Sequence, residues 1–208
     1  MTDPSTYPVK FDVEYQDREL NRLTTFFRIF TIIPIVIVLT LVIGPSWGGW
    51  DNGGDGAMLL AFLFLPVLLM LVFREKYPRW WFDWNLQLAR FIARVHVYFA
   101  CIDDRYPSTD DQQSVTLELP YPAQPGDVNR WLPLVKWFLA IPHYIVLFFL
   151  YFGLIVVVIV AWFAILFTGR YPRDIFEFVE GVIRWHNRVV GYAFILVTDE
   201  YPPFRLRP

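Results

Sequence analysis

The chain has 208 residues, a formal net charge of −2 and a hydrophobic fraction of 56%, with a mean hydropathy of +0.39. So large an apolar fraction exceeds what a soluble domain of this size usually hides, and 9 Trp, 20 Phe and 11 Tyr are typical of membrane-interface belts. The charge gives no case for nucleic acid, which would call for a basic excess. The single cysteine, Cys101, excludes an intramolecular disulfide and offers no metal-ligand spacing.

The first half begins with a polar segment and continues into two apolar runs. Residues 1–22 have no apolar core of a cleavable signal peptide, and "VKFDVEY" within them alternates as half-buried strands do. The apolar runs start at Ile29 and Ala57, and flanking aromatic residues bring each close to the ~20 residues that span a bilayer. The loop between them, Pro45–Gly56, contains no Lys or Arg. These features predict a transmembrane hairpin.

A Tyr-Pro-Arg corner follows, at Tyr77 to Arg79. Proline disfavours helix in the residue before it and suits the first position of a new helix. The corner therefore predicts that the chain leaves the bilayer and turns to lie along it as an amphipathic helix. Polar residues spaced four, three and four apart make one stripe on that helix: Asp83, Gln87, Arg90 and Arg94.

The second half repeats this order. "VTLELPY" alternates as a strand does, and one apolar run then extends from Leu132 to Phe167. A single helix of that length would measure ~54 Å, against a hydrocarbon core of ~30 Å, which predicts a second hairpin that turns near Tyr151–Gly153. A second corner, Tyr171 to Arg173, precedes the matching stripe of Glu177, Glu180, Arg184 and Arg188.

The two halves align as copies. "NRLTTFFRIFTIIP" from Asn21 and "NRWLPLVKWFLAIP" from Asn129 match without a gap, and this pairs Arg28 with Lys136. The sequence predicts repeat 1 at residues 1–108, a linker at 109–114 and repeat 2 at 115–208. We expect a mainly α-helical integral membrane protein with four transmembrane helices in two parallel hairpins, two interfacial amphipathic helices and short β-strands. Because neither hairpin loop is basic, the positive-inside rule predicts cytoplasmic termini.

The stripes have three interpretations. Their arginines lie among lipid head groups, or the two stripes pair across the axis between the repeats, or acid and arginine pair along each helix. The residues predicted to contact lipid or a partner protein are Arg79, Arg90, Arg94, Arg173, Arg184, Arg188, Trp81 and Trp185.

No sequence pattern predicts catalysis. His96, His143 and His186 make no metal-ligand pattern; His143, at a membrane entry, is the candidate polar intramembrane residue. The acidic pairs Asp103-Asp104 and Asp199-Glu200 are possible cation ligands, but the pattern favours solvated turns. With no nucleotide-binding or nucleophile motif, the sequence predicts no catalytic residue, no metal and no cofactor.

The second half, from "VTLELPYP" through "DEYPPF", resembles a family of bacterial membrane proteins described only as a domain of unknown function. The matching phrases include "AIPHYIVLFFL", "FTGRYPRDIFEF" and "VIRWHNRVVGYAFILVTDEYPPF". The resemblance implies a multi-pass membrane protein of the bacterial inner membrane and brings no activity.

We therefore expect a non-enzymatic accessory or scaffold protein. It would engage lipid head groups and a partner protein, or a second copy of itself, at the cytoplasmic face. The alternatives are a small transporter or channel with its pathway between the repeats, and a lipid-modifying membrane enzyme.

Overall fold

The computed structural model describes residues 7–43, 55–109, 111, 113–124 and 126–207. The elements in chain order are β1 (Lys10–Val13), α1 (Arg22–Phe26), α2 (Arg28–Ile43), α3 (Asp55–Arg74), α4 (Arg79–Phe99), β2 (Val115–Glu118), α5 (Pro133–Leu139), α6 (Ile141–Thr168) and α7 (Arg173–Ala193). The prediction of a mainly helical chain with short strands is confirmed.

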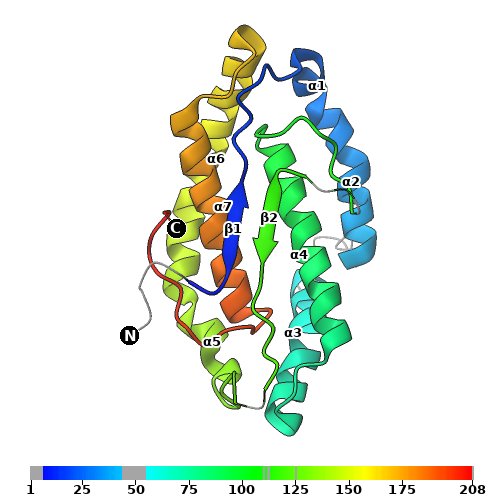
Figure 1. Ribbon diagram of the computed structural model, residues 1–208, viewed down its shortest axis with the longest axis vertical. Helices are drawn as coiled ribbons and strands as arrows, with labels where there is room; N and C mark the ends of the chain where they lie inside the picture. Colours follow the sequence, from blue (N-terminus) through cyan, green and yellow to red (C-terminus); the bar gives the residue numbers. More distant parts are fainter. Residues whose placement is uncertain (1–6, 44–54, 110, 112, 125, 208) are drawn as a thin grey trace.

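The strands form a small antiparallel sheet that lies on two long helices (Figure 1). Phe11 of β1 stands opposite Leu117 of β2, and both side chains are buried. Strand β1 packs on α7 while β2 packs on α4, so each strand covers a helix from the other half of the chain. On the outer face of the sheet the exposed side chains of Lys10 and Glu118 form an ion pair.

Helix α6 is continuous, and it corrects the prediction of a second hairpin. It runs through the expected turn at Tyr151–Gly153 without a break and packs against α7. Gly153 is a packing position there, because a Cβ atom at this residue would lie 3.7 Å from the Phe178 ring. At 28 residues the helix is ~42 Å long.

The described part of the first half does not supply two spans either. Its apolar stretches there, Arg28–Leu39 and Phe64–Arg74, are each shorter than a bilayer span, and most of the predicted loop Pro45–Gly56 lies outside the described residues. Within the described part of the chain, only α6 is long and apolar enough to span a membrane. The prediction of four transmembrane helices in two hairpins is therefore wrong. Apolar composition shows that a run avoids water, but not that it crosses a membrane.

Both Tyr-Pro-Arg corners stand where a helix begins. Helices α4 and α7 start directly after the prolines, whose extended backbone (φ −63° and −65°) ends the preceding segment. The Tyr77 carbonyl accepts a hydrogen bond from the Tyr121 hydroxyl at 2.9 Å, and the Tyr171 carbonyl accepts one from Tyr15 at 2.7 Å. Each corner is thus tied to the residues that follow a strand. The internal duplication remains a prediction. Two copies of one unit would make equivalent contacts at their corners, as Tyr121 and Tyr15 do.

Candidate functional site

A cavity of about 260 Å³ lies between α4, α6 and α7. Its wall is aliphatic and aromatic except for three side chains with polar atoms, His96 of α4, Tyr151 of α6 and His186 of α7. Tyr151 and His186 also line a neighbouring hollow of about 350 Å³ between α6 and α7. Three elements that are distant in the sequence therefore bring their polar groups to one place.

The polar groups of this cavity form a compact set. The Tyr151 hydroxyl lies 2.6 Å from Nδ1 of His186, and the His96 ring meets the His186 ring edge-on with centroids 5.7 Å apart. A phenol and an imidazole at this distance can hold or pass one proton. No group of three His, Cys, Asp or Glu side chains suits a metal ion in the part of the chain that the structure describes. The site offers hydrogen-bonding positions in an otherwise apolar space.

Both imidazoles of the cavity are neutral at neutral pH. Burial lowers the pKa of His96 below its ordinary value. Burial, with a smaller contribution from neighbouring His96, lowers the pKa of His186 to about 3. The cavity is therefore uncharged under physiological conditions.

Acidification is expected to destabilise the fold through these histidines. The unfolded chain takes up a proton near pH 6.5, whereas folded His186 stays neutral down to a pH of about 3. The contribution of neutral His186 to the free energy of unfolding is therefore fully present above pH 6.5. It is lost as the pH falls, by about 1.4 kcal/mol per pH unit for one such group. Unfolding followed in mild detergent at pH 7 and pH 5 should show a loss of roughly 2 kcal/mol from His186. A His186→Gln variant should have a flatter pH dependence; an equally steep one would contradict this origin.

The arginine stripe of α7 lies inside the molecule. Arg184 and Arg188 are 5% and 3% exposed. Arg184 donates from Nε to the Phe11 carbonyl at 2.9 Å and from Nη1 to the Leu206 carbonyl at 3.1 Å. Arg188 donates from Nη1 to two carbonyls of the C-terminal tail, at 3.3 and 3.2 Å. These arginines fasten strand β1 and the tail onto α7, and they are not placed to meet lipid head groups.

The stripe of α4 is used in a similar way. Nε of Arg90 donates to the Leu117 carbonyl of β2 at 3.0 Å, and Nη1 of Arg94 donates to the Ser108 carbonyl. Arg90 thus holds β2 as its counterpart Arg184 holds β1. Arg90 and Arg184 bond strand carbonyls, and Arg184 also pairs with Glu180 along α7, as the third of the interpretations has it.

The corner arginines Arg79 and Arg173 remain exposed. Each lies over a tyrosine ring, Arg79 4.6 Å from the centroid of Tyr121 and Arg173 5.3 Å from that of Tyr15. Of the six predicted arginines, this pair is exposed, whereas Arg90 and Arg94 are half-buried and Arg184 and Arg188 are buried.

The remaining predicted residues belong to packed regions. Trp81 is half-buried and stacks on Trp84 with centroids 5.4 Å apart. Trp185 is buried and donates from Nε1 to Nδ1 of His143 at 3.0 Å. His143 is fully buried in the first turn of α6, where it stacks on Phe204 at 4.0 Å. This places His143 in a core contact rather than along a pathway.

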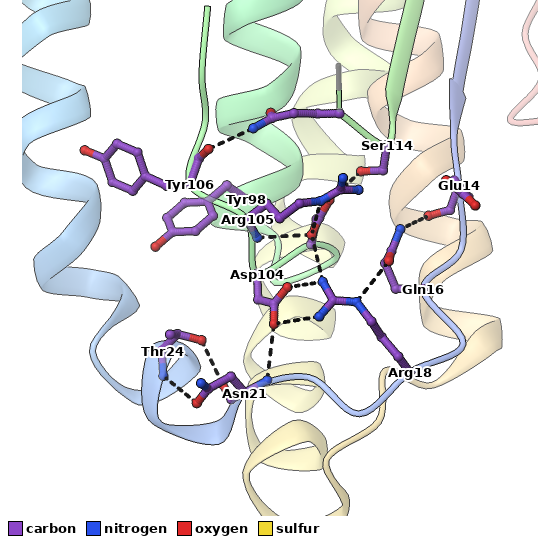
Figure 2. Close-up of polar contacts among 12 residues, drawn as sticks. Glu14, Gln16, Arg18, Asn21, Thr24, Tyr98, Asp104, Arg105, Tyr106 and Ser114 are labelled. Atoms are coloured by element: carbon purple, nitrogen blue, oxygen red, sulfur yellow. Dashed lines mark hydrogen bonds and ion pairs between the residues drawn. The ribbon is translucent and has the colours of Figure 1, made fainter. Parts of the chain in front are cut away.

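The acidic residues of the predicted turns anchor helix starts. Figure 2 shows Asp104 between Arg18 and the backbone N–H of Asn21, whose side chain caps α1. In the second half, Asp199 accepts from the N–H of Asn129 at 2.5 Å, and Asn129 again bonds the backbone just ahead. Each acid thus accepts a hydrogen bond from the backbone of the segment that precedes a helix.

The sequence did not predict that His96, Tyr151 and His186 meet in one cavity. His96 and His186 do not occupy equivalent repeat positions, and nothing in their local pattern indicates that they meet. Their contact depends on how α4 and α7 pack, which periodicity does not specify.

Residues 131–205 match a family described as a domain of unknown function (DUF4389). The match covers just over a third of the chain and contains α5, α6 and α7. It confirms the expected resemblance for that part of the second half. No curated protein matches the chain, and no solved structure does.

Proposed function

We propose that this protein is a non-enzymatic accessory protein that lies flat in one leaflet of a membrane. Its apolar helices enter the acyl region, its ends contact lipid head groups, and its strand face stays in water for a partner protein or a second copy. The resemblance to bacterial membrane proteins favours the cytoplasmic membrane of a bacterium.

One observation carries this proposal, an exposed apolar stripe that follows α6 from end to end. Its members recur every three or four residues, each between 37% and 78% exposed: Ile141, Ile145, Phe148, Phe149, Phe152, Ile155, Val156, Ile159, Val160, Phe163 and Phe167. Transfer of these half-exposed side chains from water to hydrocarbon is worth on the order of 10 kcal/mol. A stripe of this size is typical of a membrane or protein contact.

The strand face has the opposite character. Lys10 and Glu118 are exposed there, and the side chain of Asp12 is 79% exposed. Charged side chains such as these are costly in contact with lipid hydrocarbon. If α6 stood across the bilayer, the sheet and the buried arginines of α7 would lie at the same depth. Lying flat keeps the exposed face of the sheet in water and the buried arginines out of the acyl region.

The exposed basic residues favour the same orientation. Helix α6 runs the length of the molecule (Figure 1), and the backbone bond from Leu20 to Gly169 (2.8 Å) brings the N-terminal segment to its far end. Exposed cations lie at both ends: Arg22, Arg170 and Arg173 at that end, and Arg74, Lys76, Arg79 and Arg130 near the start of α6. A crossing helix normally has its positive residues on one side. A helix lying flat brings both groups to the same layer of head groups.

Purification of the full chain in a mild detergent, followed by protein and lipid mass spectrometry, tests the proposal. We expect anionic lipid to be enriched over the membrane average, together with a partner protein or a second copy of the chain. A lone, monodisperse species with no enriched lipid would contradict the proposal.

A charge variant makes the test specific. Replacing Arg79 and Arg173 with glutamine removes two exposed cations, each worth about 1 kcal/mol at an anionic surface, so enrichment should fall several-fold. The matched control is Lys10→Gln, which removes one exposed cation from the strand face and should leave enrichment unchanged.

A further inference from the structure

A second cavity, of about 360 Å³, lies beside the start of α2, the end of α4 and the second half of α6. Arg28 is the charged residue in its wall, which is otherwise apolar apart from the thiol of Cys101; the other lining residues are Ile29, Phe99, Val158, Ile159, Trp162 and Phe163. Its size is in the range of small-molecule sites. Ile29, Phe99 and Phe163 are about half-exposed or more, so the cavity opens on the apolar side of the molecule.

Arg28 is buried, and two of its three guanidinium nitrogens have no oxygen or nitrogen acceptor in the described structure. The residue is 3% exposed. Nη1 donates to the Tyr98 carbonyl at 2.7 Å, and the guanidinium lies 4.5 Å from the Tyr98 ring centroid. Nε and Nη2 are buried and have no oxygen or nitrogen acceptor among the described residues; the neighbouring Cys101 thiol is only a weak acceptor. A buried cation with unpaired donors is costly unless an anion completes it.

The corresponding residue of the other half shows what such a completion looks like. Lys136, which aligns with Arg28, is fully buried and lies 2.6 Å from the Asp199 carboxylate. The aligned acid of the first half, Asp104, is turned toward Arg18 and Asn21 instead (Figure 2). Arg28 is therefore left without the carboxylate that its position has in the second half.

No nearby group in the described structure replaces that carboxylate. Asp103 is engaged by Ser114 at 2.6 Å and by Arg105 at 3.0 Å. Burial raises the pKa of the Cys101 thiol despite the opposing effect of Arg28, so the thiol is neutral at neutral pH. Among the residues that the structure describes, none forms an ion pair with Arg28.

We propose that this cavity binds an anionic amphiphile, with its carboxylate or phosphate head on Nε and Nη2 of Arg28 and its apolar chain along Ile159 and Phe163. A guanidinium offers two parallel donors to such a head group, and the apolar wall supplies burial for the chain. The inference goes beyond membrane attachment, because the site is a defined cavity with its own buried cation and can be occupied in detergent.

Binding of oleate to the full chain in a non-ionic detergent tests the site, with oleyl alcohol and inorganic phosphate as the comparison probes. We expect saturable binding of one oleate, and the neutral alcohol should bind about tenfold more weakly or worse because it lacks the charge. Phosphate alone should bind far more weakly than oleate. If phosphate bound as tightly as oleate, the cavity would be a simple anion site and the proposed amphiphile would be wrong. If oleyl alcohol bound as tightly as oleate, the proposed role of Arg28 would be wrong.

Two variants separate the site from the fold. Arg28→Gln should reduce oleate affinity about tenfold or more, whereas Lys10→Gln, at an exposed lysine of the strand face away from the cavity, should not. Ile159→Trp fills the cavity and leaves Arg28 in place, so it should also reduce affinity; Val156→Trp, at an exposed position of α6 outside the cavity wall, should leave it unchanged. Unchanged affinity in Ile159→Trp would overturn the proposal even if Arg28→Gln fails to fold. A chain that binds oleate but does not bind membranes would contradict the proposed membrane attachment and leave the cavity proposal standing.

Discussion

Replacing Arg184 with methionine is expected to lower the free energy of unfolding by about 3–5 kcal/mol, because a buried charge pair loses one partner. Arg184 lies in ion-pair contact with Glu180, which is 8% exposed, and it also holds the Phe11 and Leu206 carbonyls. The variant leaves the Glu180 carboxylate buried without its cation. Burial already raises the pKa of Glu180, and without Arg184 this pKa should rise further. Chemical or thermal unfolding in mild detergent measures the loss.

The matched control is Arg90→Met on α4. Arg90 is at the equivalent position and holds the Leu117 carbonyl of the other strand, but no ion pair with an acid is found for it in the described structure. Loss of one hydrogen bond to a charged donor should cost about 1.5–3 kcal/mol. Equal losses in the two variants would contradict the claim that the buried Glu180–Arg184 pair distinguishes the α7 position.

The second large effect is expected from Asp199→Ala. This change removes the carboxylate that lies 2.6 Å from Nζ of Lys136, whose side chain is fully buried. Burial lowers the pKa of Lys136, and Asp199 partly opposes that shift. An uncompensated ammonium should therefore cost about 3–5 kcal/mol or give up its proton. Unfolding in mild detergent again provides the measurement.

The aligned acid of the first half is the control for that experiment. Asp104→Ala removes a carboxylate whose cationic partner, Arg18, is 48% exposed. Water replaces the lost contact, so the expected cost is about 1 kcal/mol or less. A cost for Asp104→Ala as large as that for Asp199→Ala would show that burial of the cation does not govern these pairs.

Local sequence signals predicted the element starts well. Helices α4 and α7 begin directly after the Tyr-Pro dipeptides, because proline restricts the residue before it and suits the start of a helix. The alternating segments near Phe11 and Leu117 do form strands. These signals involve neighbouring residues, which is why the sequence alone carries them.

Arrangement in space was harder to predict. A uniformly apolar run has no periodic mark of where it turns, and a glycine such as Gly153 suits a tight turn and a close helix contact equally. The stripe containing Arg184 correctly identified one face of a helix, but a strand and a tail from distant parts of the chain cover that face. The donors of Arg28 lack a carboxylate because Asp104 binds Arg18 instead, and this contact joins residues that are far apart in the sequence.

The central claim is that α6 lies flat within one leaflet, and a depth measurement tests it most directly. Spin labels at Ile145, Val156 and Phe163 sample the exposed stripe near its start, middle and far part, over ~27 Å of helix, and a label at Thr116 samples the strand face. In vesicles, with Cys101 replaced by alanine, we expect the three α6 labels to show the same depth by their accessibility to oxygen and to an aqueous nickel chelate. Thr116 should be accessible from water. A label at Val156 that lies much deeper than the other two would show that α6 crosses the bilayer, and three α6 labels open to the nickel chelate would show that it does not enter the membrane.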